Sequence, residues 1–371
     1  MAIFTPQRAS ITRPIKCTQC GAHIWGAEPK DCYHRCRECG FPYYGFVKNG
    51  EVDDYRCLVC DQPFVYSWSL LTDFVCCPRF ALYAHDLSRQ MGTQAMDFGG
   101  ALHEAIAYLK VHRDLEAAID LFREVYVDPS AGLPETERAS ELRTHERGEG
   151  ILRTFWQRFA DDELMTRPSY VEKVAAVELA PGILYSAKID DLSLEAQEAT
   201  DYKTTSWFNN DRFLETWHMN HQFTGYCVVP TALTGINIEK VRVVVIKVSK
   251  GRKTPPPGVS KKDWVEYQDA YDFKVILQRR QEWHKQDFMR TIKFYVKWWN
   301  DCRKEGYWPQ NSKYCWHYQR KCIYFDICRM PFERVFDELR YSFPLRVWDP
   351  MTGEGEILRE RESARIAKQG G

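Results

Sequence analysis

Long hydrophobic runs are missing from this sequence. No stretch approaches the roughly 18 apolar residues that a membrane-spanning helix needs, and the first residues lack the pattern of a signal peptide. A dominant charge is missing too, because Lys and Arg total 51 and Asp and Glu also total 51. We therefore expect a soluble intracellular protein without a membrane partner, in which any nucleic-acid contact comes from a local patch.

Apolar side chains are plentiful although dispersed. Hydrophobic residues make up 44% and aromatic residues 14% of the 371 positions, enough for one large domain and a small one. There is no internal repeat. Of the fourteen cysteines, seven lie in the first 60 residues, two are adjacent at 76 and 77, and three fall between 315 and 328. Since the cytosol keeps thiols reduced, this clustering predicts two metal sites and not disulfides.

The N-terminal cysteines have the spacing of a structural zinc ribbon. Two Cys-x2-Cys-Gly turns, at Cys17 and Cys20 and at Cys36 and Cys39, are separated by fifteen residues. Each turn presents two thiolates, and its glycine lets the turn close tightly. Four such ligands can hold a small segment that has little core of its own. A second zinc could be bound by a further set: Cys32, His34, Cys57 and Cys60.

Helix and strand patterns alternate after a boundary near residue 62. Ser67 or Ser69 is expected to cap a helix that runs through Phe80. Residues 113–162 have the pattern of two charged amphipathic helices, which we expect to form a peripheral insertion. A β-hairpin is then predicted around Pro181-Gly182.

The second half of the chain continues this alternation. The segment "FLETWHMNHQFTGYCVV" predicts a helix with Gln222 and Tyr226 on one face, and "KVRVVVIKVSKG" is the clearest strand. Residues 270–304 are predicted to form one long helix. The isolated Cys227 and Cys302 are expected to be buried as small apolar residues. Four tryptophans are expected to pack in the core and not to stack on bases: Trp298, Trp299, Trp308 and Trp316.

Charged residues stand within two predicted strands near the middle of the chain. Residues 183–192 alternate in polarity and include Asp190, and the next extended segment ends in Asp201-Tyr202-Lys203. Because burying an unpaired charge is costly, these are either solvated edge positions or they converge on a ligand. Two such carboxylates can chelate Mg²⁺ or Mn²⁺. Lys203 points to the same face as Asp201 and could orient or deprotonate a water that attacks a phosphodiester.

Short motifs follow one another in a recognisable order: Cys77-Pro78-Arg79, Gly99-x3-His103, Lys188-Ile189-Asp190, Asp201-Tyr202-Lys203, Gln222-x3-Tyr226 and Cys315-x6-Cys322-x5-Cys328. Over residues 66 to about 330 this order resembles the RecB-type branch of the PD-(D/E)XK nuclease superfamily. It is similar in particular to the iron–sulfur members of that branch, such as the AddB nuclease domain and the CRISPR-adaptation exonucleases. Two departures are Ala187, where relatives usually have glycine, and the x6 spacing, where many have x2.

The resemblance implies roles for residues whose patterns are weak on their own. A lone histidine on an apolar helical face is more often a core residue, but here His103 would be a metal ligand. The implied ligands of Mg²⁺ or Mn²⁺ are His103, Asp190, Asp201 and the backbone carbonyl of Tyr202. Lys203 would be the catalytic lysine, and Gln222 and Tyr226 would position the DNA backbone. Glu178 would support the site from outside its ligands.

The resemblance also implies that the later cysteines hold a [4Fe–4S] cluster. Its ligands would be Cys77, Cys315, Cys322 and Cys328, with Cys76 as an alternative to Cys77 and zinc as an alternative metal. The first ligand comes from far upstream, so the cluster would join the start of the domain to its end. We therefore expect a structural role and not a redox role.

The implied fold is α/β, with a restriction-endonuclease-like core in which helices flank a central mixed sheet. Its parts would be a zinc ribbon over 1–62, the nuclease domain over 63–335 and an extension over 336–371. We expect a DNA exonuclease that acts on linear or single-stranded ends in the cytoplasm of a bacterial, archaeal or phage-infected cell. Its partner could be a helicase, integrase or recombination protein. The alternative is a non-catalytic DNA-binding scaffold of the same fold.

Overall fold

The computed structural model describes residues 64–87, 89, 92–132, 141–205, 215–248, 272–317 and 320–343, together with the backbone of 15–16 and 23–24. The latter form strands β1 (Ile15–Lys16) and β2 (His23–Ile24), which pair antiparallel. No helix among these residues is long and apolar enough to cross a membrane. The predicted zinc ligands all lie outside the described residues: Cys17, Cys20, Cys32, His34, Cys36, Cys39, Cys57 and Cys60.

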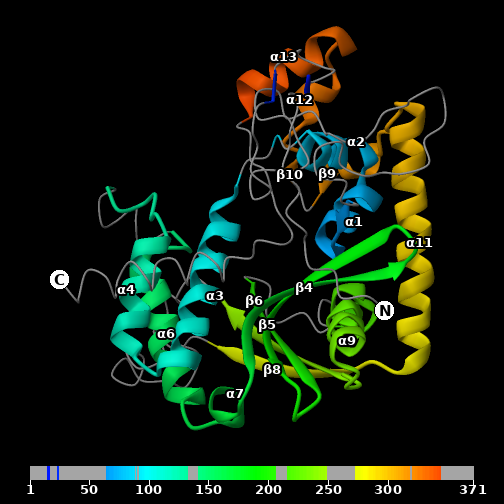
Figure 1. Ribbon diagram of the computed structural model, residues 1–371. Coiled ribbons are helices and arrows are strands. Elements are labelled where there is room, and N and C mark those ends of the chain that lie inside the picture. Colours follow the sequence, from blue (N-terminus) through cyan, green and yellow to red (C-terminus); the bar gives the residue numbers. More distant parts are fainter. Residues whose placement is uncertain are drawn as a thin grey trace.

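A mixed six-stranded sheet forms the centre of the fold (Figure 1). Its order is β3-β5-β6-β7-β8, with β4 paired to β5 beside that path. The β3–β5 and β6–β7 pairs are parallel, and the other pairs are antiparallel. The strands are β3 (Val65–Tyr66), β4 (Tyr170–Ala180), β5 (Ile183–Ser193), β6 (Glu198–Thr205), β7 (Lys240–Lys247) and β8 (Phe273–Arg279).

Helices cover both faces of this sheet (Figure 1). One core packs three helices against the β7 side chains Val241, Val243 and Val245. These helices are α1 (Trp68–Cys76), α9 (His221–Thr234) and α11 (Glu282–Glu305). The second core packs three others against Val244 and Ile246 on the opposite face. They are α3 (Gln94–His112), α4 (Leu115–Val125) and α6 (His145–Phe159). The alternation along β7 therefore separates the two layers.

Shorter elements complete the chain. Before and within the sheet region these are α2 (Pro78–Ala81), η2 (Leu82–Asp86), α7 (Glu163–Thr166) and η3 (Thr216–Met219). A lobe near the C-terminal end contains η4 (Ser312–Tyr314), β9 (Trp316–His317), β10 (Arg320–Lys321), α12 (Phe325–Cys328) and α13 (Phe332–Ser342). Figure 1 shows this lobe next to α2, the helix that follows Cys77.

Several predicted elements are confirmed. Ser67 caps α1 by accepting a hydrogen bond from the backbone N–H of Leu70 at 3.4 Å. The hairpin of β4 and β5 turns at Gly182, whose φ of 74° is accessible to glycine without strain. The helix predicted to carry Gln222 and Tyr226 is α9, and the clearest predicted strand is β7. The mixed α/β core is thus as expected.

Three expectations are wrong. The first helix does not run through Phe80, because it ends at Cys76 and Pro78 begins α2. The predicted helix over 270–304 begins only at Glu282, since the preceding β-branched segment pairs with β7 as an edge strand. Trp316 is 62% exposed, whereas Trp299 and Trp308 are buried and Trp298 is partly buried in the core.

The charged helices of residues 113–162 are also less peripheral than predicted. Their outer faces are charged, but their apolar faces form much of the second core. Phe155 of α6 contacts the rings of Tyr202 and Phe273, with centroid distances of 6.0 and 5.9 Å. These helices therefore cover the sheet face behind the strand that carries Asp201.

Gly148 of α6 tests how tightly this layer is packed. A Cβ atom at this position would lie 2.1 Å from two ring carbons of Phe122, which is fully buried on α4. We predict that Gly148→Ala lowers the free energy of unfolding by about 1–3 kcal/mol despite the better helix propensity of alanine. Denaturant midpoints measure the effect. Gly132→Ala is the control, because its Cβ would meet nothing within 4 Å; equal midpoints for the two variants would contradict the prediction.

Candidate active site

The candidate site forms where two strands of the sheet separate. Strands β5 and β6 pair only through Asp191–Thr200, Leu192–Ala199 and Ser193–Glu198. Beyond these pairs β6 continues alongside β7 and β5 alongside β4. Asp190 and Asp201 are the first residues past the last shared pair, so both carboxylates lie where the strands diverge.

A hydrogen bond between a backbone amide of β6 and a side chain of β5 crosses this separation. The backbone N–H of Tyr202 donates to Asp190 Oδ2 at 2.8 Å. Asp190 and Asp201 are 7% and 1% exposed. A buried amide that has left its strand ladder needs a substitute acceptor, and the Asp190 carboxylate supplies it. The two acids are therefore fixed relative to one another by the fold.

A chain of hydrogen bonds brings the predicted lysine, tyrosine and glutamine to Asp201. Lys203 Nζ and the Tyr226 hydroxyl both donate to Asp201 Oδ1 at 3.0 Å. Gln222 Nε2 in turn donates to the Tyr226 hydroxyl at 2.7 Å. The i, i+4 spacing on α9 thus places both side chains towards β6. All three predicted positions meet at the same opening.

His103 of α3 reaches the same oxygen of Asp190 that accepts the Tyr202 N–H. Its Nδ1 atom lies 3.4 Å from Asp190 Oδ2. The approach of this helix depends on Gly99, because a Cβ there would lie 3.1 Å from the hydroxyl of Thr204 on β6. A small residue one helical turn before His103 therefore lets α3 lie close enough to β6 for the histidine to contact the carboxylate.

Glu172 of β4 is a site residue that the sequence did not predict. One ligand atom each of His103, Glu172 and Asp190 lie within 4.8 Å of one another. Glu172 is 7% exposed and has a φ of 51°, in the left-handed region that non-glycine residues rarely adopt. Such strain in a buried acid beside two other ligands is typical of a functional position.

The register of the hairpin explains why Glu172 was missed. Ala180 pairs with Ile183 next to the turn, but Glu178 pairs with Leu184, which shows a one-residue bulge between them. Counting back from the turn without the bulge would place Lys173 opposite Asp190. Glu178 itself accepts a hydrogen bond from the backbone N–H of Gly182 at 2.9 Å, at the far end of the strand from Glu172.

Charges around the site hold the acids in different states. Burial would raise the pKa of Asp190, but His103, Lys203 and the Tyr202 N–H outweigh it and lower that pKa to about 2. Burial and the charge of Asp190 raise the pKa of Glu172 to about 7, against the opposing effect of Lys188. Burial raises the pKa of Asp201 as well. Asp190 is therefore the acid held most firmly in its ionised form.

The two cationic partners lie nearer the solvent than the acids. Burial alone would lower the pKa of both His103 and Lys203. Asp190 and Glu172 instead raise the pKa of His103, and Asp201 and Asp190 raise that of Lys203. Their side chains are 20% and 32% exposed. Ionised carboxylates thus form the base of the site, and groups that can exchange a proton or a partner form its rim.

The donor set fits a hard divalent cation. It offers carboxylate oxygens and one imidazole nitrogen, which suit Mg²⁺ or Mn²⁺. Asp201 Oδ2 is buried and has no hydrogen-bond partner among the described residues, so one of its oxygens keeps its lone pairs available. Lys188 Nζ lies 2.7 Å from Glu172 Oε2 and neutralises this acid from the strand beside it.

The later cysteines approach one another in the C-terminal lobe. Cys77, Cys315, Cys322 and Cys328 are unpaired, partly exposed thiols. The backbone N–H of Asn311 donates to Cys77 Sγ at 3.5 Å, and Gln310 Nε2 donates to Cys315 Sγ at 3.5 Å. Burial raises the pKa of Cys328 to about 11, with smaller contributions from the other three thiols. Cys227 and Cys302 are buried, as predicted.

The site and its sheet agree with a match to a known protein family. Acids, a histidine and a lysine thus meet at the divergence of two strands in a mixed sheet, and three of these groups could hold a metal ion. The family model described as the PD-(D/E)XK nuclease superfamily matches residues 66–329. The chain belongs to this superfamily.

Solved structures resemble the chain only distantly. One is a provisionally named exonuclease from Eubacterium rectale, with 13% identity, coverage of 71% of this chain and 88% of that one, and a TM-score of 0.43. Another is the protein SSO0001, with 14% identity, coverage of 62% and 85%, and a TM-score of 0.24. No curated protein matches the sequence. The family match, and not these structures, shows the superfamily to which the chain belongs.

Glu172 makes the stability of the metal-free protein depend on pH. Its pKa is about 7 in the folded protein and 4.5 ordinarily, so the folded state binds the proton more tightly. We predict that stability falls as pH rises from about 4.5 to 7, by up to about 3 kcal/mol from this group. Urea unfolding with a chelator present measures the trend. Glu172→Gln should flatten this pH window, and an unchanged slope in that variant would contradict the prediction.

Proposed function

We propose that the protein is a divalent-metal-dependent DNA nuclease, an exonuclease acting on DNA ends in repair, recombination or phage DNA processing. One observation carries the proposal. Lys203 lies 3.0 Å from Asp201, beside a group of His103, Glu172 and Asp190 whose ligand atoms lie within 4.8 Å of one another. A scaffold protein would not need to keep a lysine, a histidine and three acids at one opening.

Each side chain has a role that follows from its contacts. His103, Glu172, Asp190 and Asp201 would hold the cation, with the Tyr202 carbonyl as the predicted backbone ligand. A bound divalent cation would lower the pKa of water and stabilise the charge that develops on the phosphate. Lys203 would orient the water and balance this charge.

Gln222 and Tyr226 would position the phosphate backbone. Tyr226 both receives a hydrogen bond from Gln222 and donates one to Asp201. A phosphate that accepted a hydrogen bond from Gln222 would therefore lie one side chain away from the lysine and acids. This connection supports the predicted DNA-positioning role of α9.

We further propose that Cys77, Cys315, Cys322 and Cys328 bind a [4Fe–4S] cluster. Supporting this set, the charges of Cys77 and Cys315 affect the pKa values of both Cys322 and Cys328. Two N–H groups already point at these sulfurs, as hydrogen bonds to cluster sulfurs require. The zinc sites of residues 1–62 stay a prediction from cysteine spacing. We propose that this zinc ribbon recruits the protein or grips DNA.

Lys203→Ala tests the proposed activity. We predict that wild type with Mg²⁺ or Mn²⁺ degrades end-labelled linear DNA and spares closed circular DNA. The variant should cleave at least about 100-fold more slowly, because the lysine's general acid–base and electrostatic contribution is removed. Gel analysis of the labelled products measures both. Lys173→Ala is the control, since this exposed lysine follows Glu172 on the same strand. Cleavage by neither wild type nor control would favour the scaffold alternative.

Adjacent cysteines allow a matched test of the cluster. We predict that Cys77→Ser, purified anaerobically, loses most of its iron and its visible absorbance, whereas Cys76→Ser keeps both. The physical reason is that Cys77 affects the pKa values of Cys322 and Cys328 and accepts a hydrogen bond at its sulfur from Asn311. Metal analysis for iron and zinc measures the content. Iron loss confined to Cys76→Ser would reverse the ligand assignment, and zinc without iron in wild type would replace the cluster with zinc.

A further inference from the structure

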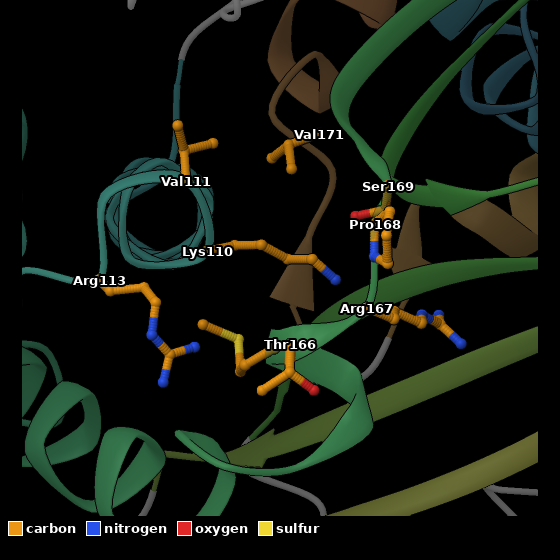
Figure 2. Close-up of a pocket in the computed structure, with 9 residues that line it drawn as sticks. Lys110, Val111, Arg113, Thr166, Arg167, Pro168, Ser169 and Val171 are labelled. Carbon is orange, nitrogen blue, oxygen red and sulfur yellow. The ribbon is translucent and has the colours of Figure 1, made fainter.

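A cavity of about 540 Å³ adjoins the candidate active site (Figure 2). It lies between the end of α3 and the segment that leads from α7 into β4. Val171 lines it and directly precedes Glu172. Lys110 lines it from α3, seven residues after His103, which is two helical turns or about 10 Å along the same face. The cavity is therefore within the reach of a strand whose phosphate occupies the site.

The lining of the cavity is cationic. Among its nine residues are Lys110, Arg113 and Arg167, and none is acidic. In Figure 2 the Lys110 side chain extends from the helix towards the β4 segment, and Arg113 extends towards Thr166. Ser169 also lines the cavity. Its buried Oγ has no hydrogen-bond partner among the described residues. Cations and an unused hydroxyl are donors suited to phosphate oxygens.

Buried acids behind the cavity hold two of these cations in place. Lys110 Nζ contacts Asp191 Oδ2 at 2.6 Å and the Leu164 carbonyl. Arg167 donates to Glu198 at 2.7 Å, and Arg242 donates to the same carboxylate at 2.6 Å. One carboxylate thus serves two guanidinium groups. The pairs fix the wall of the cavity.

Arg113 is the cation that is available to a ligand. Its side chain is 42% exposed, and its Nη2 donates to the Ala160 carbonyl at 2.8 Å. The guanidinium also lies 5.0 Å from the Trp156 ring centroid of α6. Its only acidic contact in the described chain is Asp161 at 3.8 Å, and such an exposed pair is worth little.

We infer that this cavity is a second phosphate subsite, which binds the nucleic-acid strand beside the phosphate undergoing cleavage. The inference rests on the proposed nuclease function. Arg113 and Ser169 donate hydrogen bonds to the phosphate oxygens, and the paired Lys110 and Arg167 form the fixed wall behind them. The phosphate could be internal to the strand or could terminate it, and end-specific substrates distinguish the two.

Binding to oligonucleotides tests the subsite without turnover. Full-length protein carrying Lys203→Ala is titrated with fluorescein-labelled single strands that end in a 5′-phosphate, a 3′-phosphate or hydroxyl groups, and anisotropy gives the Kd. Adding Arg113→Gln should weaken binding about tenfold, as loss of a charge-assisted hydrogen bond does. The dependence of log K on log salt should become shallower by about 0.7, the contribution of one phosphate contact. Ser169→Ala should weaken binding to a smaller extent.

The matched control is Arg153→Gln, which removes an exposed arginine of α6 that pairs with Glu116 at 2.6 Å, away from the cavity. If Arg113→Gln changes Kd and salt slope no more than this control, the subsite is disproved while the nuclease function stands. If the parent protein binds no DNA, the proposed function itself fails. A tenfold loss for only one type of phosphorylated end assigns a terminal phosphate, and an equal loss for all strands assigns an internal one.

Discussion

The hydrogen bond from the Tyr202 amide to the Asp190 carboxylate organises the candidate site. Strands that separate must satisfy the backbone groups that they no longer share. Here β6 keeps its other edge in register with β7, while β5 stays with β4, and one carboxylate spans the opening between them. The acid that lies at the divergence is thus also the acceptor that stabilises it.

This hydrogen bond holds charged carboxylates at buried positions, where desolvation destabilises them. Asp190 and Asp201 are buried, and their desolvation is offset by His103 and Lys203 at 3.4 and 3.0 Å. Buried charges persist only with partners of this kind. The partners are more exposed than the acids, so His103 and Lys203 form the side of the site that faces solvent. These two partners thus balance the charge of the two buried carboxylates.

Local patterns predicted those parts of the fold that depend on local physics. Alternation identified β7, Gly182 identified the hairpin turn, and Asp201-x-Lys203 identified two groups on one strand face. Tertiary contacts decided the rest. Phe273 begins an edge strand because β7 offers it a partner, and Trp316 is exposed because its short hairpin lies outside the core.

Glu172 shows most clearly what a pattern cannot supply. Its place opposite Asp190 depends on a bulge near the turn, and a one-residue change in register reverses the face of every later side chain. Its φ of 51° then directs the side chain towards His103. Neither property is encoded in the spacing of acidic residues. The family resemblance found His103 and Lys203 because those depend on motif order, which a bulge does not alter.

The cysteine lobe and the candidate active site are connected through a single helix. The end of α1 precedes Cys77, and its first residue, Trp68, contacts the ring of His221 with a centroid distance of 5.0 Å. His221 is the residue before Gln222. A displacement of α1 at its cysteine end would therefore reach the start of α9 across one aromatic contact.

A buried ion pair limits such displacement. Arg303 of α11 donates to both oxygens of Asp86 in η2, and both side chains are almost fully buried. Breaking a pair of this kind by removing one partner leaves an uncompensated charge and is strongly destabilising. The segment that follows α2 and the end of α11 are thus joined by this ion pair. A metal cluster in the lobe would then act mainly on the orientation of α1 and α2 and less on the folding of the sheet.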